Sequence, residues 1–430
     1  MLLQFSFSNF RSFRDEAVLD MRASSISELS NHVRVSGNDN VLTLSAIYGA
    51  NASGKSNLFA AFDFMANYVK YSTFIDISNK KISMFITNML QQKPFIFTEK
   101  NRKKSEFELY FTIEENTKVT YYNYGFVLDQ KGIVEEWLNT NTKTGVVRGT
   151  EYKMLFKRKR NKDLELANSI MEYKENLLVS MKDKTLIISL GSGLGVKVCK
   201  EIMNWFDNIE PIDCSKFYQE EIDANSFNKT IYENDGIKNQ VVNYLRSFDA
   251  SIYDLNVEKN EGTDDEQKES LYSVFTVHKT EGDNKRVVVP LSEESSGTVK
   301  MYHLFSKINS VLLKGSVLFS DEIDIKLHPL LMRNIIITFT DPVKNPKGAQ
   351  LIFTTHNTIY MEMDLFRRDE IWFVEKNNQI SELYSLDDIT DSKGNKVRKD
   401  NNYQKNYLLG RYGAVPFLSS IFGGEDDEEI

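Results

Sequence analysis

The spacing of apolar side chains near the start of the chain predicts a strand, a second strand and a helix. Residues 1–10 alternate apolar and polar positions, as a strand with one buried face and one exposed face does. Residues 41–48 form a nearly continuous apolar run, which is typical of a buried strand. Residues 57–65 place apolar side chains on one face of a helix. A buried strand followed directly by a helix is the repeating unit of α/β proteins.

The middle of the chain changes character twice. Aromatic and β-branched runs at 107–113, 122–128 and 133–138 lie within residues 93–156 and are separated by charged or glycine turns. This pattern predicts an antiparallel sheet. From about 163 to 250 the apolar residues recur at helical spacing but form no sustained heptads. We therefore expect a short helical insertion there and not a long coiled coil.

The last third returns to strands and helices. Residues 258–269 are polar and acidic, and we expect an exposed loop. Strands are predicted at 273–278 and 286–291, and a helix at 299–312. Two further buried strands are expected, covering the ranges 317–322 and 351–356, and both end in chemically active side chains.

A glycine-rich loop with the pattern G-x-x-x-x-G-K-S occupies residues 49–56, between the strand 41–48 and the helix 57–65. Glycines let the backbone turn several N–H groups toward one point, where they and the helix start can hold a phosphate. A chance glycine turn before a helix is the alternative interpretation. The pattern predicts a site for ATP and Mg²⁺, in which Lys55 reaches the β- and γ-phosphates and Ser56 ligates the metal. The predicted nucleotide-binding residues of this loop are Asn51, Ala52, Ser53, Gly54, Lys55, Ser56 and Asn57.

Two acids end the strand at 317–322. A phosphate-loop site needs one acid for Mg²⁺ and a second to activate water. We assign Asp321 to the metal and Glu322 to the general base. The strand at 351–356 ends in His356, which we expect to contact the γ-phosphate.

Ser295, Ser296 and Gly297 stand directly before the helix at 299–312. Hydroxyl and backbone donors at a helix start form an anion site. A plain helix cap is the alternative interpretation of these three residues.

Composition and charge set wider limits. With 430 residues the chain is more than one compact domain, or one large domain with an insertion. Its net charge of −8 argues against a protein coated in nucleic acid, while a local basic face stays open. The densest positive cluster, at 156–162, is expected to be a solvated charge run and not a phosphate contact. Cys199 and Cys214 form no C-x-x-C pair, so we expect buried thiols in a reducing compartment. No apolar run approaches the ~18 residues of a membrane span, and the N-terminus lacks the features of a signal peptide, so the cytoplasm is the expected location.

The order of the four motifs resembles that of ABC-type ATPases of the SMC/RecF/OLD group. The stretch 321–324 followed by 327–329, and the ending at 407–417, are similar to the ATPase subunits of the bacterial AbiL/RloA anti-phage group. The ATPase of the PARIS defence system is a looser relative. The turn at 9–13 is also typical of such ATPase heads and makes Arg11 a candidate for the nucleotide site, with a solvated arginine as the alternative.

The resemblance implies an α/β fold, a P-loop ABC-type ATPase head with an antiparallel β lobe and a helical insertion. It implies a homodimer or higher homo-oligomer, in which Ser295 and Gly297 of one subunit face the nucleotide held by Lys55 of the other. His328 stands at the position where such heads often carry an aspartate, and Gln91 and Gln92 are candidates for the glutamine that senses the metal. The expected parts are the N-terminal head at 1–155, the helical insertion at 156–250, the C-terminal head at 251–422 and an acidic tail at 423–430.

Function follows from the same resemblance. It implies an ATP-hydrolysing sensor or regulatory subunit of an anti-phage system, triggered by a phage protein or a nucleic acid and acting through a separately encoded effector nuclease. OLD-type relatives fuse a nuclease after the ATPase, but only 74 residues follow His356 (430 − 356), fewer than the roughly 100–150 of a typical domain. A RecF-like, ATP-gated DNA repair protein and an ATP-gated scaffold with slow turnover are the alternatives.

Overall fold

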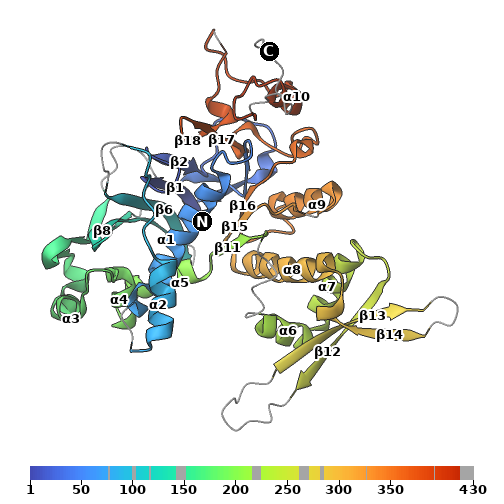
Figure 1. Ribbon diagram of the computed structural model, residues 1–430, viewed down its shortest axis with the longest axis horizontal. Coiled ribbons are helices and arrows are strands. Elements are labelled where there is room, and N and C mark those ends of the chain that lie inside the picture. The colour runs from blue at the N-terminus through green and yellow to red at the C-terminus, as the bar shows by residue number, and fades with distance from the viewer. Residues whose placement is uncertain are drawn as a thin grey trace.

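The computed structural model describes ten stretches of the chain, and they form a mixed α/β structure with two large sheets (Figure 1). The described residues are 1–75, 78–98, 103–115, 118–141, 152–215, 224–260, 271–280, 285–325, 327–391 and 393–416. The predicted acidic tail at 423–430 lies outside them, as does Phe417.

A six-stranded sheet forms the centre of the molecule. Its strands, in spatial order, are β11 (Glu210–Asp213), β15 (Val317–Asp321), β16 (Gln350–Thr354), β5 (Leu44–Tyr48), β17 (Ile371–Asn377) and β18 (Ile380–Ser385). All neighbours are parallel except β18, which runs antiparallel to β17. The carboxyl ends of the parallel strands therefore meet at one edge, which is where ligands bind in open α/β sheets.

Helices cover both faces of this sheet. The side chains of β5 alternate, so that Ile47 faces one hydrophobic core while Ala46 and Tyr48 face the other. The first core contains α1 (Lys55–Tyr71), and the second contains α8 (Ser296–Lys314) and α9 (Pro329–Thr340). A strand that is buried on both faces reads as a continuous apolar run, and this explains the sequence pattern.

A seven-stranded antiparallel sheet packs on the other side of α1. Its order is β10 (Asp163–Leu166), β9 (Lys153–Lys159), β8 (Gly132–Asn141), β7 (Lys118–Asp129), β6 (Ser105–Glu115), β1 (Leu2–Ser8) and β2 (Ala17–Asp20). The ring of Phe62 on α1 contacts Phe5 of this sheet at 5.2 Å and Phe319 of the central sheet at 5.3 Å between centroids. The predicted antiparallel sheet is confirmed, and the predicted N-terminal strand belongs to it.

The segment 156–250 is only partly the helical insertion that the spacing predicted. It contains α3 (Lys174–Ser180), α4 (Ile187–Gly193), α5 (Lys197–Asp207), α6 (Ala224–Glu233) and α7 (Asp235–Arg246), but also the end of β9 and the strands β10 and β11. Leu164 and Leu166 alternate with exposed acids on an edge strand. A strand of four residues is too short for its alternation to stand out from helical spacing.

The described residues 224–260, 271–280 and 285–290, which we call the arm, project from the side of α8 (Figure 1). Its helices α6 and α7 pack on α8 through ring pairs such as Phe227 with Tyr302 and Tyr244 with Phe305. Its strands β12 (Ile252–Asn260), β13 (Leu271–Lys279) and β14 (Arg286–Pro290) form a three-stranded antiparallel sheet. The loop expected at 258–269 begins inside β12, and its residues from 261 onward lie outside the described part.

The strand expected at 41–48 is two strands. β4 (Asp39–Leu42) pairs with β3 (Val33–Ser36) in a small hairpin, and β5 enters the central sheet. Between them the backbone N–H and the hydroxyl of Thr43 both donate to the carbonyl of His32, at 3.1 Å each. The carbonyl of Thr43 accepts from the backbone N–H of Leu351 on β16 at 2.9 Å, so Thr43 ends the hairpin and begins the contact with the central sheet. The remaining helices are α2 (Lys80–Met89) and α10 (Tyr403–Leu408).

The positive cluster at 156–162 is not the solvated charge run that we expected. Arg158 is buried and donates to the carbonyls of Lys182 and Thr185. Lys157 pairs with Glu135 and Arg160 pairs with Asp129, at 2.7 and 2.6 Å. Lys157 on β9 pairs with a carboxylate of the neighbouring strand β8, and Arg160, just after β9, pairs with the carboxylate that ends β7.

Both cysteines are buried free thiols, as predicted. Burial raises the pKa of Cys199 to about 12 and that of Cys214 to about 11. Among the described helices, none combines the length and the apolar content that crossing a bilayer requires.

Candidate functional site

The glycine-rich loop joins β5 to α1 and packs against β18. Gly49, Ala52 and Gly54 have φ values of 152°, 61° and 119°, which are backbone conformations that favour glycine. A Cβ atom on Gly54 would lie 2.4 Å from the Oγ atom of Ser381 on β18. The same Ser381 hydroxyl donates to the carbonyl of Ser53 at 2.5 Å. The central sheet thus fixes the shape of the loop.

Lys55, the first residue of α1, keeps its amino group inside the loop. Its side chain is 5% exposed, and Nζ donates to the carbonyls of Gly49 and Ala50 at 2.7 and 3.0 Å. Burial lowers the pKa of Lys55 to about 8, against the opposing effect of Asp321 and Glu322. The loop therefore holds a cation that is only partly solvated, and such a cation attracts phosphate strongly.

The other predicted residues of the loop differ in how far their side chains are exposed to solvent. Asn51, Ala52 and Ser56 are exposed. Ser53 is buried, and its hydroxyl oxygen has no hydrogen-bond partner within the described part of the chain. An unsatisfied buried hydroxyl in a loop of turned N–H groups fits a site that a polar ligand completes.

Asp321 and Glu322 end β15 beside the loop, and one threonine ties them together. The hydroxyl of Thr354, at the end of β16, donates to Asp321 Oδ1 at 2.6 Å and accepts from the backbone N–H of Glu322 at 2.8 Å. Glu322 has a φ of 51°, which is uncommon for a residue with a Cβ atom. Burial first, and then the charge of Asp321, raise the pKa of Glu322. Sequence reasoning did not single out Thr354.

His356 lies between the lysine and the glutamate. Its Nδ1 atom is 3.4 Å from Lys55 Nζ, and its Nε2 atom is 3.8 Å from Glu322 Oε1. Burial, followed by the positive charge of Lys55, lowers the pKa of His356. A neutral ring at neutral pH can accept a hydrogen bond on one side and donate one on the other.

A second network that the motifs did not reveal lies behind His356. The hydroxyl of Thr355 donates to Asp324 Oδ2 at 2.8 Å, and the hydroxyl of Tyr360 donates to the same oxygen at 3.2 Å. The backbone N–H of Asn357 donates to the Thr355 hydroxyl at 2.9 Å. These bonds fix the backbone on both sides of His356 to the segment that follows Glu322.

Arg11 lies against the start of α1. Its Nη1 atom donates to Asn57 Oδ1 at 3.2 Å, and Asn57 Nδ2 donates to the hydroxyl of Ser12 at 2.7 Å. Burial lowers the pKa of Arg11. The structure brings Arg11 to Asn57, which directly follows the loop at 49–56.

Ser295 caps the N-terminus of α8, where Thr298 N–H donates to its hydroxyl at 3.2 Å. Ser296 and Gly297 open the helix. No hydrogen bond within the described residues joins Ser295 or Gly297 to the loop of the same chain. The hydrogen bonds of the Ser295 side chain are local to the start of α8. His328 likewise caps α9, by accepting from Leu330 N–H at 3.3 Å.

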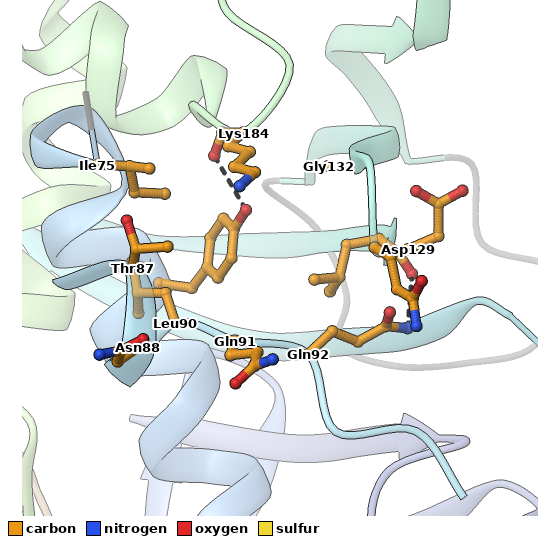
Figure 2. A pocket seen from close by; sticks show the side chains of 12 residues that line it. Ile75, Thr87, Asn88, Leu90, Gln91, Gln92, Asp129, Gly132 and Lys184 are labelled. Carbon is orange, nitrogen blue, oxygen red and sulfur yellow. Dashed lines mark hydrogen bonds between the residues drawn. The ribbon is translucent and has the colours of Figure 1, made fainter. Parts of the chain in front are cut away.

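Gln91 and Gln92 line a pocket that the glycine-rich loop does not border (Figure 2). They border a pocket of about 440 Å³ between α1, the end of α2 and the turn after β7, and no residue of the loop at 49–56 lines it. Gln92 Nε2 donates to the hydroxyl of Ser105 at 2.9 Å and to the carbonyl of Leu128 at 3.2 Å. The contacts of Gln92 are thus with the antiparallel sheet and the segment before β6.

Mg²⁺ fits the donors at this site. Within the described part of the chain, no group of three or more histidines, cysteines or acids could hold a metal by itself. Mg²⁺ usually takes only one or two protein ligands beside substrate phosphates and waters. Ser56 offers an exposed hydroxyl, and Asp321 uses only Oδ1 for a hydrogen bond with another described residue. These two side chains are the ones that would hold it.

Comparison with known proteins gives one family and no curated relative. A family described as "AAA domain, putative AbiEii toxin, Type IV TA system" matches residues 44–182 and 197–362. The matched ranges begin at β5 and end just after His356, so they include the loop, both acids and the histidine. No curated protein matches the chain.

Proposed function

The chain belongs to this AAA-domain family, and from that premise we propose that it binds ATP with Mg²⁺ and hydrolyses the ATP. The observation that carries the proposal is the contact of Lys55, His356 and Glu322 at the carboxyl edge of the central sheet. A buried cation, a neutral imidazole and a carboxylate with a raised pKa meet there, next to a loop of turned backbone N–H groups. Strongly perturbed titrating groups gathered in one place mark functional sites.

Some residues of the site bind the phosphates and the metal, and another accepts a proton. The loop N–H groups and Lys55 bind the phosphates, and Ser56 and Asp321 hold the metal. Mg-ATP supplies the phosphoryl group that a water attacks. Glu322 accepts the proton of that water, and its raised pKa brings it nearer to the pH at which a general base works best. His356 holds the Glu322 carboxylate and the Lys55 amino group in one arrangement.

We further propose that two copies pair around nucleotide. Ser295 and Gly297 at the start of α8 make no hydrogen bond to the loop of their own subunit, which supports a role in the site of a second subunit. The helix start presents backbone N–H groups and a partial positive charge, which suit the γ-phosphate of a partner's nucleotide.

The cellular role that we propose is a sensor or regulatory subunit of an anti-phage system with a separately encoded effector nuclease. Its support is the order of motifs and a family description that names a toxin of a type IV toxin–antitoxin system. Co-expression with the product of the neighbouring gene, followed by phage challenge, tests this role. Protection that persists in Lys55→Ala cells would contradict it.

The test of ATP hydrolysis uses two substitutions in the purified full chain. Lys55→Ala should abolish ATP binding in calorimetry, whereas Lys131→Ala, on an exposed turn, should not. Glu322→Gln should keep ATP binding but lose about 10²–10⁴ in turnover, which is the usual contribution of a general base. Glu165→Gln, on the exposed face of β10, is its matched control. A wild-type hydrolysis rate in Glu322→Gln would overturn the assignment of the base.

A further inference from the structure

Three cationic side chains of the arm gather around one tyrosine ring. Lys279 Nζ lies 3.9 Å from the ring centroid of Tyr253, and the guanidinium carbons of Arg286 and Arg246 lie 5.2 and 5.8 Å from it. They come from the end of β13, the start of β14 and the end of α7. Each of the three distances lies within the range of cation–π attraction, so the ring holds the like charges together.

We call this group the arm cluster (Arg246, Tyr253, Lys279 and Arg286), and its three cations are exposed around the half-buried tyrosine. No ion pair of the described residues includes any of its three cations. Two acids of the arm are engaged elsewhere, since Asp254 pairs with Lys238 at 3.3 Å and Asp249 accepts from Ser251 N–H at 2.9 Å. The cations in and just after β9 differ, because Lys157 and Arg160 have carboxylate partners.

The chemistry of the arm cluster favours phosphate. Guanidinium groups bind phosphate oxygens in pairs, and a neighbouring ammonium adds a point charge. On the edge strand β14, Val288 shares the face of Arg286, because side chains alternate along a strand, and it is an apolar side chain that is 49% exposed. Apolar surface beside a row of cations suits unpaired bases next to their own backbone phosphates, whereas the bases of a duplex are stacked away from such contact.

We propose that the arm binds single-stranded nucleic acid through Arg246, Lys279 and Arg286. The site is also connected to the start of α8. His278, next to Lys279, lies 2.7 Å from the carboxylate of Glu294, and Glu294 directly precedes Ser295. One side-chain contact, between the neighbours of Lys279 and Ser295, therefore joins the arm to the residue that we assign to subunit pairing.

The experiment measures binding of a fluorescent single-stranded oligonucleotide of about 16 nucleotides by anisotropy, at several salt concentrations and without ATP. The test compares three ligands, which are single-stranded DNA, single-stranded RNA of the same sequence and the matching duplex. The variant Arg246→Gln/Lys279→Gln/Arg286→Gln is compared with Lys131→Gln/Lys153→Gln/Lys399→Gln, which removes three exposed charges outside the arm. Circular dichroism verifies that both variants are folded.

We expect the arm variant to bind at least about tenfold more weakly than wild type. The slope of the logarithm of the binding constant against the logarithm of the salt concentration should shrink by about 2, because each phosphate contact contributes about 0.7 to this slope for single strands. The control variant should keep the wild-type slope. Equal slopes in wild type and the arm variant would overturn the proposal. So would tighter binding of the duplex, or equal displacement of the strand by polyglutamate, which would make the arm cluster a site for acidic proteins. Because ATP is absent, these results are independent of the proposed ATPase activity.

Discussion

At the scale of single residues, Thr354 does the most to define the site, because one hydroxyl connects both acids. It donates to the carboxylate of Asp321 and accepts from the backbone of Glu322, whose left-handed φ needs support from its surroundings. A valine at 354 would keep the shape of the side chain but would leave both partners without this bond.

We therefore expect Thr354→Val to lower the turnover of ATP by about tenfold to a hundredfold, as small misplacements of catalytic groups do. ATP binding should change little, because Lys55 and the loop are untouched. Phosphate release and calorimetry measure the two effects. Thr338→Val, which removes a hydroxyl bonded to Asn334 on the exposed side of α9, is the control. Turnover equal to that of the control would show that Thr354 does not position the acids.

The sequence identified the residues whose chemistry is rare, and it missed those that position them. Lys55, Glu322 and His356 were chosen from motifs, and the structure brings them within 4 Å of one another in a chain of contacts. Thr354 and Ser381 are ordinary hydroxyls, and their partners lie 32 or more positions away. Nothing local distinguishes such residues, because their importance comes only from the order of strands in the sheet.

At the scale of elements, the glycine-rich loop depends on β18 as much as on its own glycines. Gly54 combines a φ of 119° with a neighbouring Ser381 hydroxyl that occupies the space of a Cβ atom. Gly54→Ala should therefore lower the free energy of unfolding by more than about 1 kcal/mol and abolish ATP binding.

Gly193 of α4 provides the comparison, since its Cβ would meet nothing within 4 Å. Gly193→Ala should be neutral or stabilising, as alanine favours helix by about 1 kcal/mol over glycine. Thermal unfolding and calorimetry distinguish the two alanine variants. Full ATP affinity in Gly54→Ala would mean that the loop can form without contact to β18.

Element prediction succeeded where a pattern was long and failed where it was short. The strands β6, β7 and β8 have ten or more residues each, and all three were predicted. The strands β10 and β11 have four residues each and were absorbed into an expected helical region. β11 contains Pro211, which a central strand tolerates poorly, but here it forms the edge of the sheet. Only tertiary pairing reveals that position.

At the scale of the whole molecule, one subunit provides only half of the nucleotide site that we propose, because Ser295 would act in the site of a second subunit. Ser295→Arg places a long cation where the partner's γ-phosphate would dock. We expect it to bind ATP as a single subunit and to lose ATP-dependent pairing in light scattering, measured in the Glu322→Gln background so that ATP is not consumed. Ser180→Arg, at the exposed end of α3, should pair normally. Pairing of the Ser295→Arg protein would contradict the shared site.

The order of strands in the central sheet has a consequence for synthesis on the ribosome. β5 carries the loop but lies between β16 and β17, which begin 302 and 323 positions after β5 ends (350 − 48 and 371 − 48). At translation rates of about 5–20 residues per second, the loop is made roughly 15 to 60 seconds before either neighbour emerges. A nascent chain should therefore be unable to bind nucleotide until it is nearly complete. Chains stalled before residue 350 should gain no protection from proteolysis when ATP is added, whereas released full-length chains should.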